Sequence, residues 1–300
     1  MDKQFDIIIL TDARYVNPKK TDTYTQNVLA EDNFVKYALE NLGLKVNRLA
    51  WDDQSFDWTH TKFVLFRSTW DYFDRFDEFS TWLNKVSTKT TLLNSEKIIR
   101  WNMDKHYLLD LKKKGIHIIP TVYLEKDSKT SLKKIHKEHN WNHTILKPCV
   151  SGAARHTYKL DHQNIEQYEA VFQELLRKEA MMLQPFQNSI VEKGEISLVI
   201  INGIYTHAVL KKAKKGDFRV QDDWGGTVHT YTPNQKEIEF AENTVKACIE
   251  FPVYARVDIT TDNDGKLAIV ELELIEPELW FRNNPPASDL LAKSIKKMLQ

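Results

Sequence analysis

Four charged residues lie on two consecutive extended segments near the C-terminal end of the sequence. Arg256 and Asp258 belong to the first segment, and Glu271 and Glu273 belong to the second. Within each segment, a spacing of two residues places both side chains on one face of a strand. Asp264-Gly265, between the segments, favours a two-residue hairpin loop. Such a loop would place Asp258 opposite Glu271 and Arg256 opposite Glu273, whereas a longer loop would change this register.

Two carboxylates that face each other across a hairpin repel unless a proton or a cation lies between them. Oxygen ligands on rigid strands suit Mg²⁺, which usually binds one or two carboxylates together with substrate phosphates. The alternative is a solvated outer face on which Arg256 and Glu273 form a cross-strand salt bridge. Charged strand faces are common on protein surfaces, so the hairpin by itself slightly favours this alternative.

A lysine followed by small residues forms a second candidate site. In ILKPCVSGAAR, residues 145–155, Lys147 ends an apolar strand that continues into a loop containing Ser151 and Gly152. Small residues allow backbone N–H groups to approach an anion closely, as glycine-rich phosphate loops do. The ordinary interpretation is a surface turn with a lysine whose charged end reaches solvent.

Three further segments have the composition of ligand-binding loops or edges. The strand MMLQPF, residues 181–186, stops at a proline, so its edge could offer backbone groups to an adenine ring. The loop at 210–226 contains four lysines and one arginine and could hold an anion or a nucleic acid. RSTWDYFDR, residues 67–75, follows a buried strand, where open α/β sheets bind ligands. The alternative for 181–186 is an ordinary strand end, for 210–226 a solvated charged loop, and for 67–75 a contact between domains.

The elements that must position these residues fall into two regions. Up to about residue 100, short apolar strands at 5–10, 45–50 and 62–68 alternate with helical patterns. This alternation favours a parallel sheet covered on both faces. Strand pairs dominate after residue 100, including a hairpin at Asn202-Gly203. The predicted fold class is therefore α/β followed by α+β.

The composition limits the function classes. Of 300 residues, 42% are hydrophobic and 28% are charged, and the formal net charge is zero, which argues against a general nucleic-acid or membrane-surface binder. No segment has the length and apolar character of a membrane span or a signal peptide, so we expect a cytoplasmic protein. The two cysteines, Cys149 and Cys248, have no metal-type spacing and suggest no disulfide framework.

Taken in their order along the chain, the motifs resemble the ATP-grasp superfamily, and most of all bacterial glutathione synthetase and related carboxylate–amine ligases. That order is a lysine on a helix, a lysine before a small-residue loop, an apolar strand exit, a basic loop and a carboxylate hairpin, over about residues 100–281. The resemblance implies an ATP-grasp fold preceded by an α/β domain with a parallel sheet. It also implies three parts: a substrate-side domain at 1–100, a central subdomain with a phosphate lid at 101–180, and a C-terminal subdomain with the metal site at 181–300.

The resemblance implies a role for each matching residue. The positions that match the family's nucleotide site are Lys105, Lys147, Ser151, Gly152, Gln184, Pro185, Phe186, Glu195 and Lys211. Lys105 and Lys147 would hold phosphates, the loop at 149–156 would be the lid, and residues 183–186 would hold the adenine through backbone groups. Glu195, with Glu192 as the alternative, would hold the ribose.

The same resemblance implies the reaction centre. Asp258, Glu271 and Glu273 would bind metal, with two Mg²⁺ ions expected and Mn²⁺ as an alternative, while Arg256 and Arg219 would stabilise charge on an acyl phosphate. The candidates for substrate contacts are Arg67 for a carboxylate, Asp71 for an ammonium group, and Trp70 and Gly226.

The sequence also departs from glutathione synthetase. The family's E-x-N is Glu271-x-Glu273 here, so Glu273 is either a metal ligand or the partner that orients Arg256. Ser197 replaces an arginine. Residues 67–75 and LIEPELWF look more like the cycloserine-pathway cyclo-ligase branch.

The implied activity is an ATP-dependent carboxylate–amine ligase that makes an amide or peptide-like bond from small-molecule substrates. The alternatives are an ATP-grasp phosphotransferase, an intramolecular cyclo-ligase acting on an amino-acid-like substrate, and a nucleotide-binding module without turnover. Dimers are common in the family, which makes a homodimer an alternative to a monomer.

Overall fold

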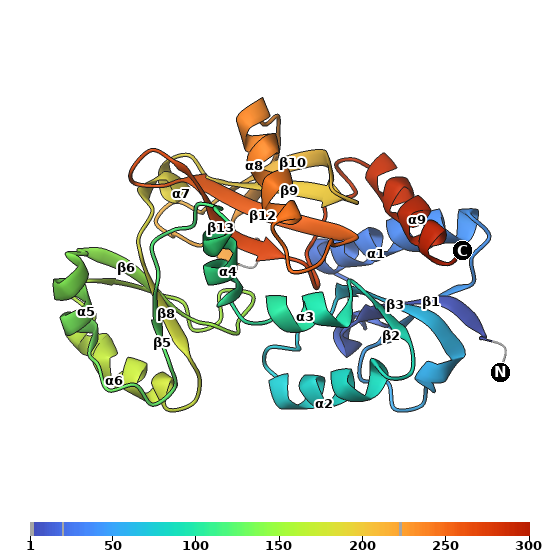
Figure 1. Ribbon diagram of the computed structural model, residues 1–300, viewed down its shortest axis with the longest axis horizontal. Helices are drawn as coiled ribbons and strands as arrows, with labels where there is room; N and C mark the ends of the chain where they lie inside the picture. Colours follow the sequence, from blue (N-terminus) through green and yellow to red (C-terminus); the bar gives the residue numbers. More distant parts are fainter. Residues whose placement is uncertain (1–2, 20, 222–223) are drawn as a thin grey trace.

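The strands of the protein form three sheets. The computed structural model describes residues 3–19, 21–221 and 224–300 (Figure 1). The N-terminal sheet is parallel, with the order β2-β1-β3-β4. Its strands are β1 (Phe5–Thr11), β2 (Val46–Ala50), β3 (Thr61–Ser68) and β4 (Thr91–Leu93). The prediction of a parallel sheet in the first hundred residues is confirmed.

Helices cover both faces of this sheet, which explains why β1 is apolar without alternation. Ile7 and Ile9 share a core with α1 (Thr23–Asn41) and α9 (Pro286–Met298). Ile8 and Leu10 face the other way and pack with α2 (Phe76–Val86) and α3 (Glu96–Asn102). A strand buried on both faces reads as a continuous apolar run.

A second sheet forms a lobe at one end of the molecule (Figure 1). It is antiparallel, with the order β5-β8-β6-β7. Its strands are β5 (Val122–Leu124), β6 (His143–Pro148), β7 (Tyr158–Asp161) and β8 (Met181–Pro185), and its helices are α5 (Leu132–His139) and α6 (Ile165–Leu176). Leu146 and Leu183 face these helices in a core of their own. Because side chains alternate along a strand, Ile145, Lys147 and Gln184 face the opposite side.

The third sheet is antiparallel, with the order β11-β10-β9-β12-β13. The strands are β9 (Glu195–Ile201), β10 (Ile204–Lys212), β11 (Thr227–Tyr231), β12 (Tyr254–Thr261) and β13 (Leu267–Glu273). Its outer face packs on α4 (Tyr107–Lys113) and α8 (Gln235–Lys246), and α7 (Asn188–Glu192) precedes β9. On the inner face of β9, Val199 and Ile201 join the core around α9, whereas Glu195 faces a cavity. The inner face of this sheet therefore packs in the core at one end of β9 and lines the cavity at the other end.

The carboxylate hairpin has the predicted pairing but not the predicted loop. Asp258 pairs with Glu271 and Arg256 pairs with Glu273. The loop is longer than two residues, because Thr261 pairs with Leu267 and Asp262 N–H donates to the Lys266 carbonyl. This shifts the register by one residue, and an irregularity between Asp258 and Ile259 shifts it back. The two-residue loop is thus wrong, and a β-bulge restores the pairing at the charged residues.

Buried polar groups join the first sheet to the third. The Asn94 amide donates to the carbonyls of Tyr254 and Leu274 and accepts from Val253 N–H. The Tyr254 hydroxyl lies within hydrogen-bond distance of three carbonyls, at Phe66, Leu93 and Ile275. The two sheets also share the core that α1 and α9 complete. The division at residues 100 and 180 stays a prediction; the strands of the three sheets lie at 5–93, 122–185 and 195–273.

Candidate active site

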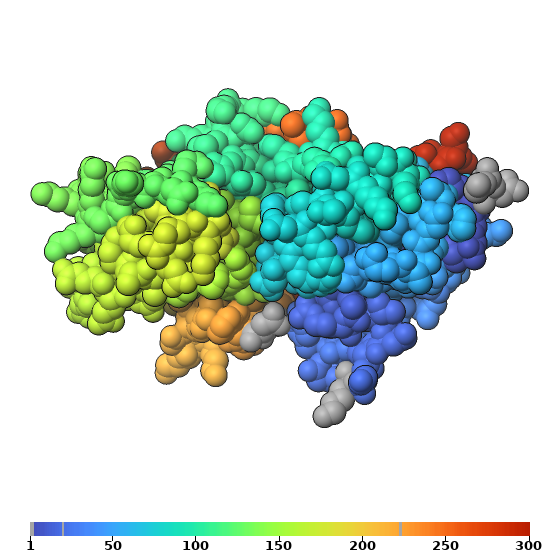
Figure 2. Space-filling view, turned by 90° about the horizontal axis from the view of Figure 1, so that it is seen from below, coloured from blue at the N-terminus to red at the C-terminus, as the bar shows by residue number. Residues whose placement is uncertain are grey.

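A single cavity collects most of the predicted site residues. It lies where the lobe of the second sheet, the inner face of the third sheet and the N-terminal region meet, and Figure 2 shows the lobe and the N-terminal region side by side. The predicted residues in its lining are Trp70, Lys105, Lys147, Ser151, Gly152, Gln184, Pro185, Phe186, Glu195, Lys211, Arg219, Arg256, Asp258, Glu271 and Glu273. Arg67, Asp71 and Gly226 do not line it.

The carboxylates of the hairpin lie among cations in this cavity. Asp258 Oδ2 is 2.9 Å from Arg256 Nη2 and 3.1 Å from Lys211 Nζ. Arg256 also forms a very short ion pair with Glu273. Glu271 lies two residues before Glu273, on the same face of β13, and its Oε1 is 3.0 Å from Lys105 Nζ. The solvated-face alternative is wrong, because these groups line a cavity and Asp258 is only 1% exposed.

Burial and charge act on these acids in opposite directions. Burial opposes ionisation of Asp258, but Arg256 and Lys211 lower its pKa to about 2. Burial raises the pKa of Glu273 to about 7 in spite of Arg256, and the charges of Glu271 and Asp258 add to the rise. A further cation beside Glu273 would favour its ionised form. The arrangement therefore suits a bound metal ion.

Three lysines enter the cavity, and one of them differs from the others. Lys147 lies on β6 and Lys211 on β10, whereas Lys105 lies on the turn before α4 and not on a helix as predicted. Lys211 Nζ is 2.5 Å from Glu195 Oε1, and Lys105 pairs with Glu271. Within the described part of the chain, Lys147 makes no hydrogen bond or salt bridge through its ammonium group. Burial lowers the pKa of Lys147. The side chain is partly buried, and Glu271 and Glu195 attract its charge without forming an ion pair. Such a cation facing a cavity suits an anion such as a phosphate.

The small-residue loop after Lys147 packs closely against the N-terminal region. A Cβ atom at Gly152 would lie 2.5 Å from the Phe73 ring, so glycine is required for this approach. Ala153 and Ala154 have φ values of 49° and 57°, in the left-handed region. Lys105 Nζ donates to the Ser151 carbonyl at 2.5 Å. The loop is thus tied to the first of the predicted phosphate lysines.

The strand exit at 183–186 lines the cavity, but some of its polar groups are already bonded. Gln184 Nε2 donates to Thr121 Oγ1 at 2.9 Å, and Phe186 N–H donates to the His143 carbonyl at 2.8 Å. The Phe186 amide is therefore not free for an adenine ring. Glu195 lines the cavity, whereas Glu192 is exposed at the end of α7 and does not, so the geometry favours Glu195 at the ribose position.

Arg219 lies on the cavity wall in the basic loop. Its guanidinium is 2.7 Å from Asp217 Oδ2 and 3.4 Å from the centre of the Trp224 ring. These contacts hold the arginine within the loop while its side chain lines the cavity. Residues 222–223 of the basic loop lie outside the described residues.

Arg67 lies in the interior, away from the cavity. Its Nη2 is 3.2 Å from Glu31 Oε1 and donates to the Pro277 carbonyl at 2.9 Å. Glu31 also accepts from the backbone N–H groups of Leu279 and Phe281. This network holds the segment 275–281 against the N-terminal domain. The structure therefore gives Arg67 Nη2 a positioning contact and leaves the side chain outside the cavity lining, while Nε and Nη1 have no partner among the described residues. Its contact with a substrate stays a prediction.

Asp71 and Gly226 are held by contacts with neighbouring protein groups. Asp71 accepts from Trp51 Nε1 at 2.7 Å and from Arg75 Nη1 at 2.9 Å. A Cβ atom at Gly226 would lie 2.2 Å from the Val220 carbonyl oxygen, so this glycine closes the basic loop. Trp70, by contrast, lines the cavity and donates through Nε1 to the Glu276 carbonyl at 2.8 Å.

Several cavity residues were not predicted. Trp280 lines the cavity, with the Arg256 and Lys211 cations 5.1 and 6.0 Å from its ring centre. Glu276 lines it too, and burial with the nearby charge of Glu273 raises its pKa to about 8. Both residues belong to LIEPELWF, a segment that differs from glutathione synthetase. That difference was the signal in the sequence that could have pointed to these residues. Asn102 bonds the backbone of Leu272 and Leu274 and fixes β13, which no local pattern indicates.

Comparison with known proteins identifies the family. Residues 104–252 match the ATP-grasp domain of prokaryotic glutathione synthetase, and residues 7–94 match the N-terminal domain of the D-cycloserine synthetase DcsG. The chain is an ATP-grasp protein. Both the predicted family and the predicted fold class are confirmed.

Individual relatives of this ATP-grasp protein agree with the assignment. The cycloserine biosynthesis protein DcsG of Streptomyces lavendulae is 27% identical over 260 residues, which cover 81% of this chain and 85% of DcsG. The crystal structure of D-cycloserine synthetase DcsG superposes with a TM-score of 0.87 at 23% identity, over 98% of this chain and 99% of that chain. The D-alanine–D-alanine ligase of Bacillus anthracis has a TM-score of 0.67 at 14% identity, over 98% and 96% of the two chains.

These comparisons support the predicted enzyme class, an ATP-dependent ligase that forms an amide or peptide-like bond. Enzymes of this family use ATP and a divalent metal. Within the described ranges, no helix is both long enough and apolar enough to cross a membrane.

Proposed function

We propose that this ATP-grasp protein joins the carboxylate of a small substrate to an amine through an acyl phosphate, using ATP and Mg²⁺. The observation that carries the proposal is the single cavity in which Asp258, Glu271 and Glu273 meet the ammonium of Lys147, which forms no ion pair within the described residues. In the first step, the substrate carboxylate attacks the γ-phosphate and ADP leaves. In the second step, the amine displaces phosphate and the C–N bond forms.

The residues of the chain would act by positioning and charge neutralisation, which is most of what phosphoryl transfer requires. Lys147 and Lys105 would hold phosphates from the lobe side and the helix side of the cavity. Arg256, held between Asp258 and Glu273, would face the charge that develops on the acyl phosphate. Arg219 would serve the same purpose from the basic loop.

The donor set fits a magnesium ion. Asp258, Glu271 and Glu273 supply only carboxylate oxygens, the ligands that Mg²⁺ prefers. Burial that raises the pKa of Glu273 is the effect that a bound cation would offset. When bound, Mg²⁺ supplies charge neutralisation on the phosphate oxygens. Two ions are proposed, with Mn²⁺ as a substitute.

A ring-closing ligase is the second candidate. The match of residues 7–94 to the N-terminal domain of D-cycloserine synthetase favours it, because this domain would be on the substrate side of the cavity. In that reaction the amine and the carboxylate would belong to the same amino-acid-like molecule.

The test is a substrate screen with purified protein, ATP and Mg²⁺. Single amino acids, pairs of amino acids, dipeptides and small hydroxy acids are supplied, ADP release is followed, and products are identified by mass spectrometry. We expect amino-acid-dependent ADP release with an amide product, or with a cyclic product for a single substrate. Release of ADP with a stably phosphorylated product would overturn the ligase and favour a phosphotransferase. The Glu271→Ala variant is the control for contaminating activity.

A further inference from the structure

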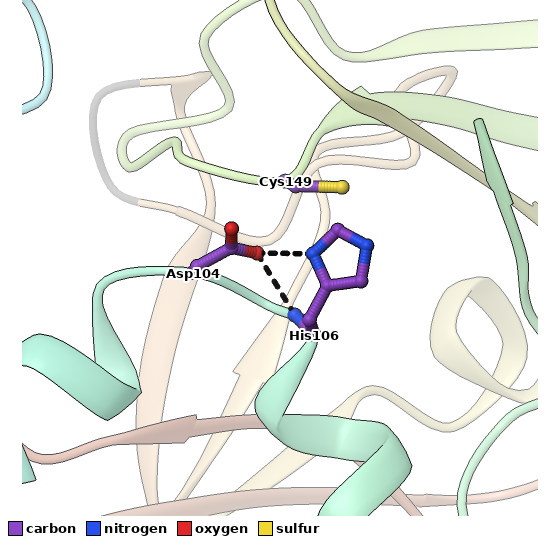
Figure 3. Close-up of side chains that lie close together, drawn as sticks. All are labelled: Asp104, His106 and Cys149. Atoms are coloured by element: carbon purple, nitrogen blue, oxygen red, sulfur yellow. Dashed lines mark hydrogen bonds and ion pairs between the residues drawn. The ribbon is translucent and has the colours of Figure 1, made fainter. Parts of the chain in front are cut away.

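Three side chains of mixed ligand type meet beside Lys105, outside the cavity lining. Asp104 and His106 precede α4, and Cys149 follows β6 (Figure 3). One carboxylate oxygen, one ring nitrogen and the sulfur all lie within 4.8 Å of one another. The ligand atoms around one Zn²⁺ are about 3–4 Å apart, because the bonds measure about 2.0–2.3 Å. We propose that Asp104, His106 and Cys149 bind a thiophilic divalent cation such as Zn²⁺, at a site separate from the magnesium site.

The chemistry of the donors separates this cluster from the carboxylate hairpin. A thiolate, an imidazole and a carboxylate are ligands that Zn²⁺ takes in proteins, whereas Mg²⁺ prefers oxygen ligands alone. The cluster has one donor of each kind. The sequence did not indicate it, because Cys149 is more than forty residues from His106 and the spacing matches no metal motif.

A second carboxylate orients the histidine as in known zinc sites. His106 Nδ1 is 2.6 Å from Asp104 Oδ1, and Nε2 is 3.1 Å from Glu125 Oε1. In the metal-free protein a proton lies between Nδ1 and Asp104 Oδ1, since two lone pairs would repel at this distance. An ion that replaces this proton would move the two atoms apart to the spacing of zinc ligands and leave Nε2–H donating to Glu125. Zinc-bound histidines usually donate their other N–H to such a carboxylate. The ring is further held by stacking on Tyr123 at 4.4 Å between centres.

The backbone brings the two halves of the cluster together. Lys105 N–H, between the two N-terminal ligands, donates to the Cys149 carbonyl at 2.9 Å. Cys149 is 1% exposed, whereas the Asp104 side chain is 46% exposed, so an ion would enter from the Asp104 side. An ion here would tie the start of the phosphate loop to the segment that carries Lys105.

Binding would release two protons. When the sulfur–zinc bond forms, the S–H bond of Cys149 breaks and its proton goes to solvent. When His106 Nδ1 and Asp104 Oδ1 bind the ion, the proton between them also goes to solvent. Zinc affinity is therefore expected to rise with pH.

The test titrates metal-free protein with Zn²⁺ by calorimetry, without nucleotide, and with Co²⁺ by absorption. We expect one high-affinity Zn²⁺ per chain and, with Co²⁺, a thiolate-to-metal charge-transfer band. Cys149→Ser should abolish the band and weaken Zn²⁺ binding at least hundredfold. His106→Gln, at a partly exposed position, should also weaken binding without disturbing the core. Glu125→Gln should cost about 10- to 100-fold in affinity.

Cys248→Ser is the matched control. Cys248 is also buried, at 7% exposure, but its sulfur lies against the Thr244 carbonyl, 3.7 Å away. This variant should bind Zn²⁺ and Co²⁺ as the unchanged protein does. Absence of Zn²⁺ binding would overturn the proposal. So would binding of equal affinity in Cys149→Ser with no charge-transfer band, which would place the ion at the carboxylate hairpin.

Discussion

Lys147 differs from the other two lysines of the cavity in its partners. Lys105 and Lys211 each form an ion pair with a carboxylate, whereas the Lys147 ammonium forms none within the described residues and is only attracted by Glu271 and Glu195. Burial of this charge is not offset by a direct partner in the free protein. A residue that disfavours the folded state and faces a binding cavity is best explained by its ligand.

Lys147→Met is expected to weaken nucleotide binding and to stabilise the free protein. Loss of a charged hydrogen bond to phosphate should weaken ATP affinity by about 10- to 100-fold, equivalent to about 1.5–3 kcal/mol. Because burial lowers the pKa of Lys147, the ammonium form disfavours folding, and its removal should raise the free energy of unfolding by about 1 kcal/mol. Calorimetry and urea unfolding measure the two effects.

The control is Lys178→Met, which removes an exposed lysine paired with Glu174 on α6. It should leave both quantities nearly unchanged. Unaltered ATP affinity in Lys147→Met would contradict the assignment of this lysine.

Glu273 has a second role open to it beside metal binding, because it pairs with Arg256. Glu273→Asn restores the residue found in glutathione synthetase and keeps an oxygen ligand while removing the charge. Asp258 still holds Arg256 in that variant, so we expect kcat to fall by no more than about tenfold. Glu273→Ala removes the ligand as well and should raise the Mg²⁺ concentration needed for activity.

Magnesium titrations of kcat distinguish the two roles. A shift in Glu273→Ala but not in Glu273→Asn identifies a metal ligand. Equal loss in both variants, with no shift in the Mg²⁺ requirement, would show that Glu273 only orients Arg256.

At the scale of the element, the segment 275–281 decides the shape of one cavity wall. It has no regular secondary structure, and buried polar contacts hold it: Arg67 to the Pro277 carbonyl, and Glu31 to two of its N–H groups. His207 Nε2 donates to the Leu279 carbonyl at 2.7 Å. These contacts come from the N-terminal domain and from β10. The two regions together therefore position Trp280 and Glu276.

Glu31→Gln should destabilise the protein strongly. The substitution leaves the Arg67 guanidinium, 2% exposed, without its counter-ion. Breaking one partner of a buried pair costs about 3–5 kcal/mol. Urea unfolding measures the loss. Glu40→Gln, on the same helix and paired with Lys36 near the surface, should change stability by less than about 0.5 kcal/mol.

Two outcomes for Glu31→Gln distinguish two roles for Arg67. Loss of stability in Glu31→Gln with KM nearly unchanged fits the positioning contact. A stable Glu31→Gln protein with a raised KM for substrate would return Arg67 to the substrate site.

At the scale of the whole molecule, the first and third sheets form one unit and the second sheet forms another. The first and third share a core completed by α1 and α9, whereas the lobe packs around its own core (Figure 1). The cavity lies between these units, so ligand binding bridges both. They share only part of the core behind the third sheet, where Met182 of β8 and Tyr123 of β5 pack. Elements with few shared core contacts open at lower free energy than the core itself.

Hydrogen exchange should record this bridging. A non-hydrolysable ATP analogue with Mg²⁺ is expected to slow amide exchange in residues 150–157 and 181–187, with little change in β1 and β3. Lys147→Met should reduce the effect at equal analogue concentration. An exchange pattern that slows only in the N-terminal domain would contradict a nucleotide site between the lobe and the third sheet.

The sequence by itself determined much of the fold class and the chemistry of the site. Alternation placed Arg256 and Asp258 on one face of the first hairpin strand, and Glu271 and Glu273 on the same face of the second strand. The apolar run at 5–10 indicated a parallel sheet. Such patterns depend on residues close together in the chain. The order of motifs then distinguished a metal site from an ordinary charged strand face.

The tertiary structure alone decided which side chains from distant segments meet. Arg67 and Asp71 lie at the end of a strand as predicted, yet Glu31 pairs with Arg67 Nη2 and Trp51 donates to Asp71, and neither side chain lines the cavity. The hairpin loop length and the bulge that offsets it were also beyond local patterns. The meeting of Cys149 with residues more than forty positions away depends on how the lobe packs against the segment before α4. Long-range packing sets these distances, and no spacing in the sequence encodes them.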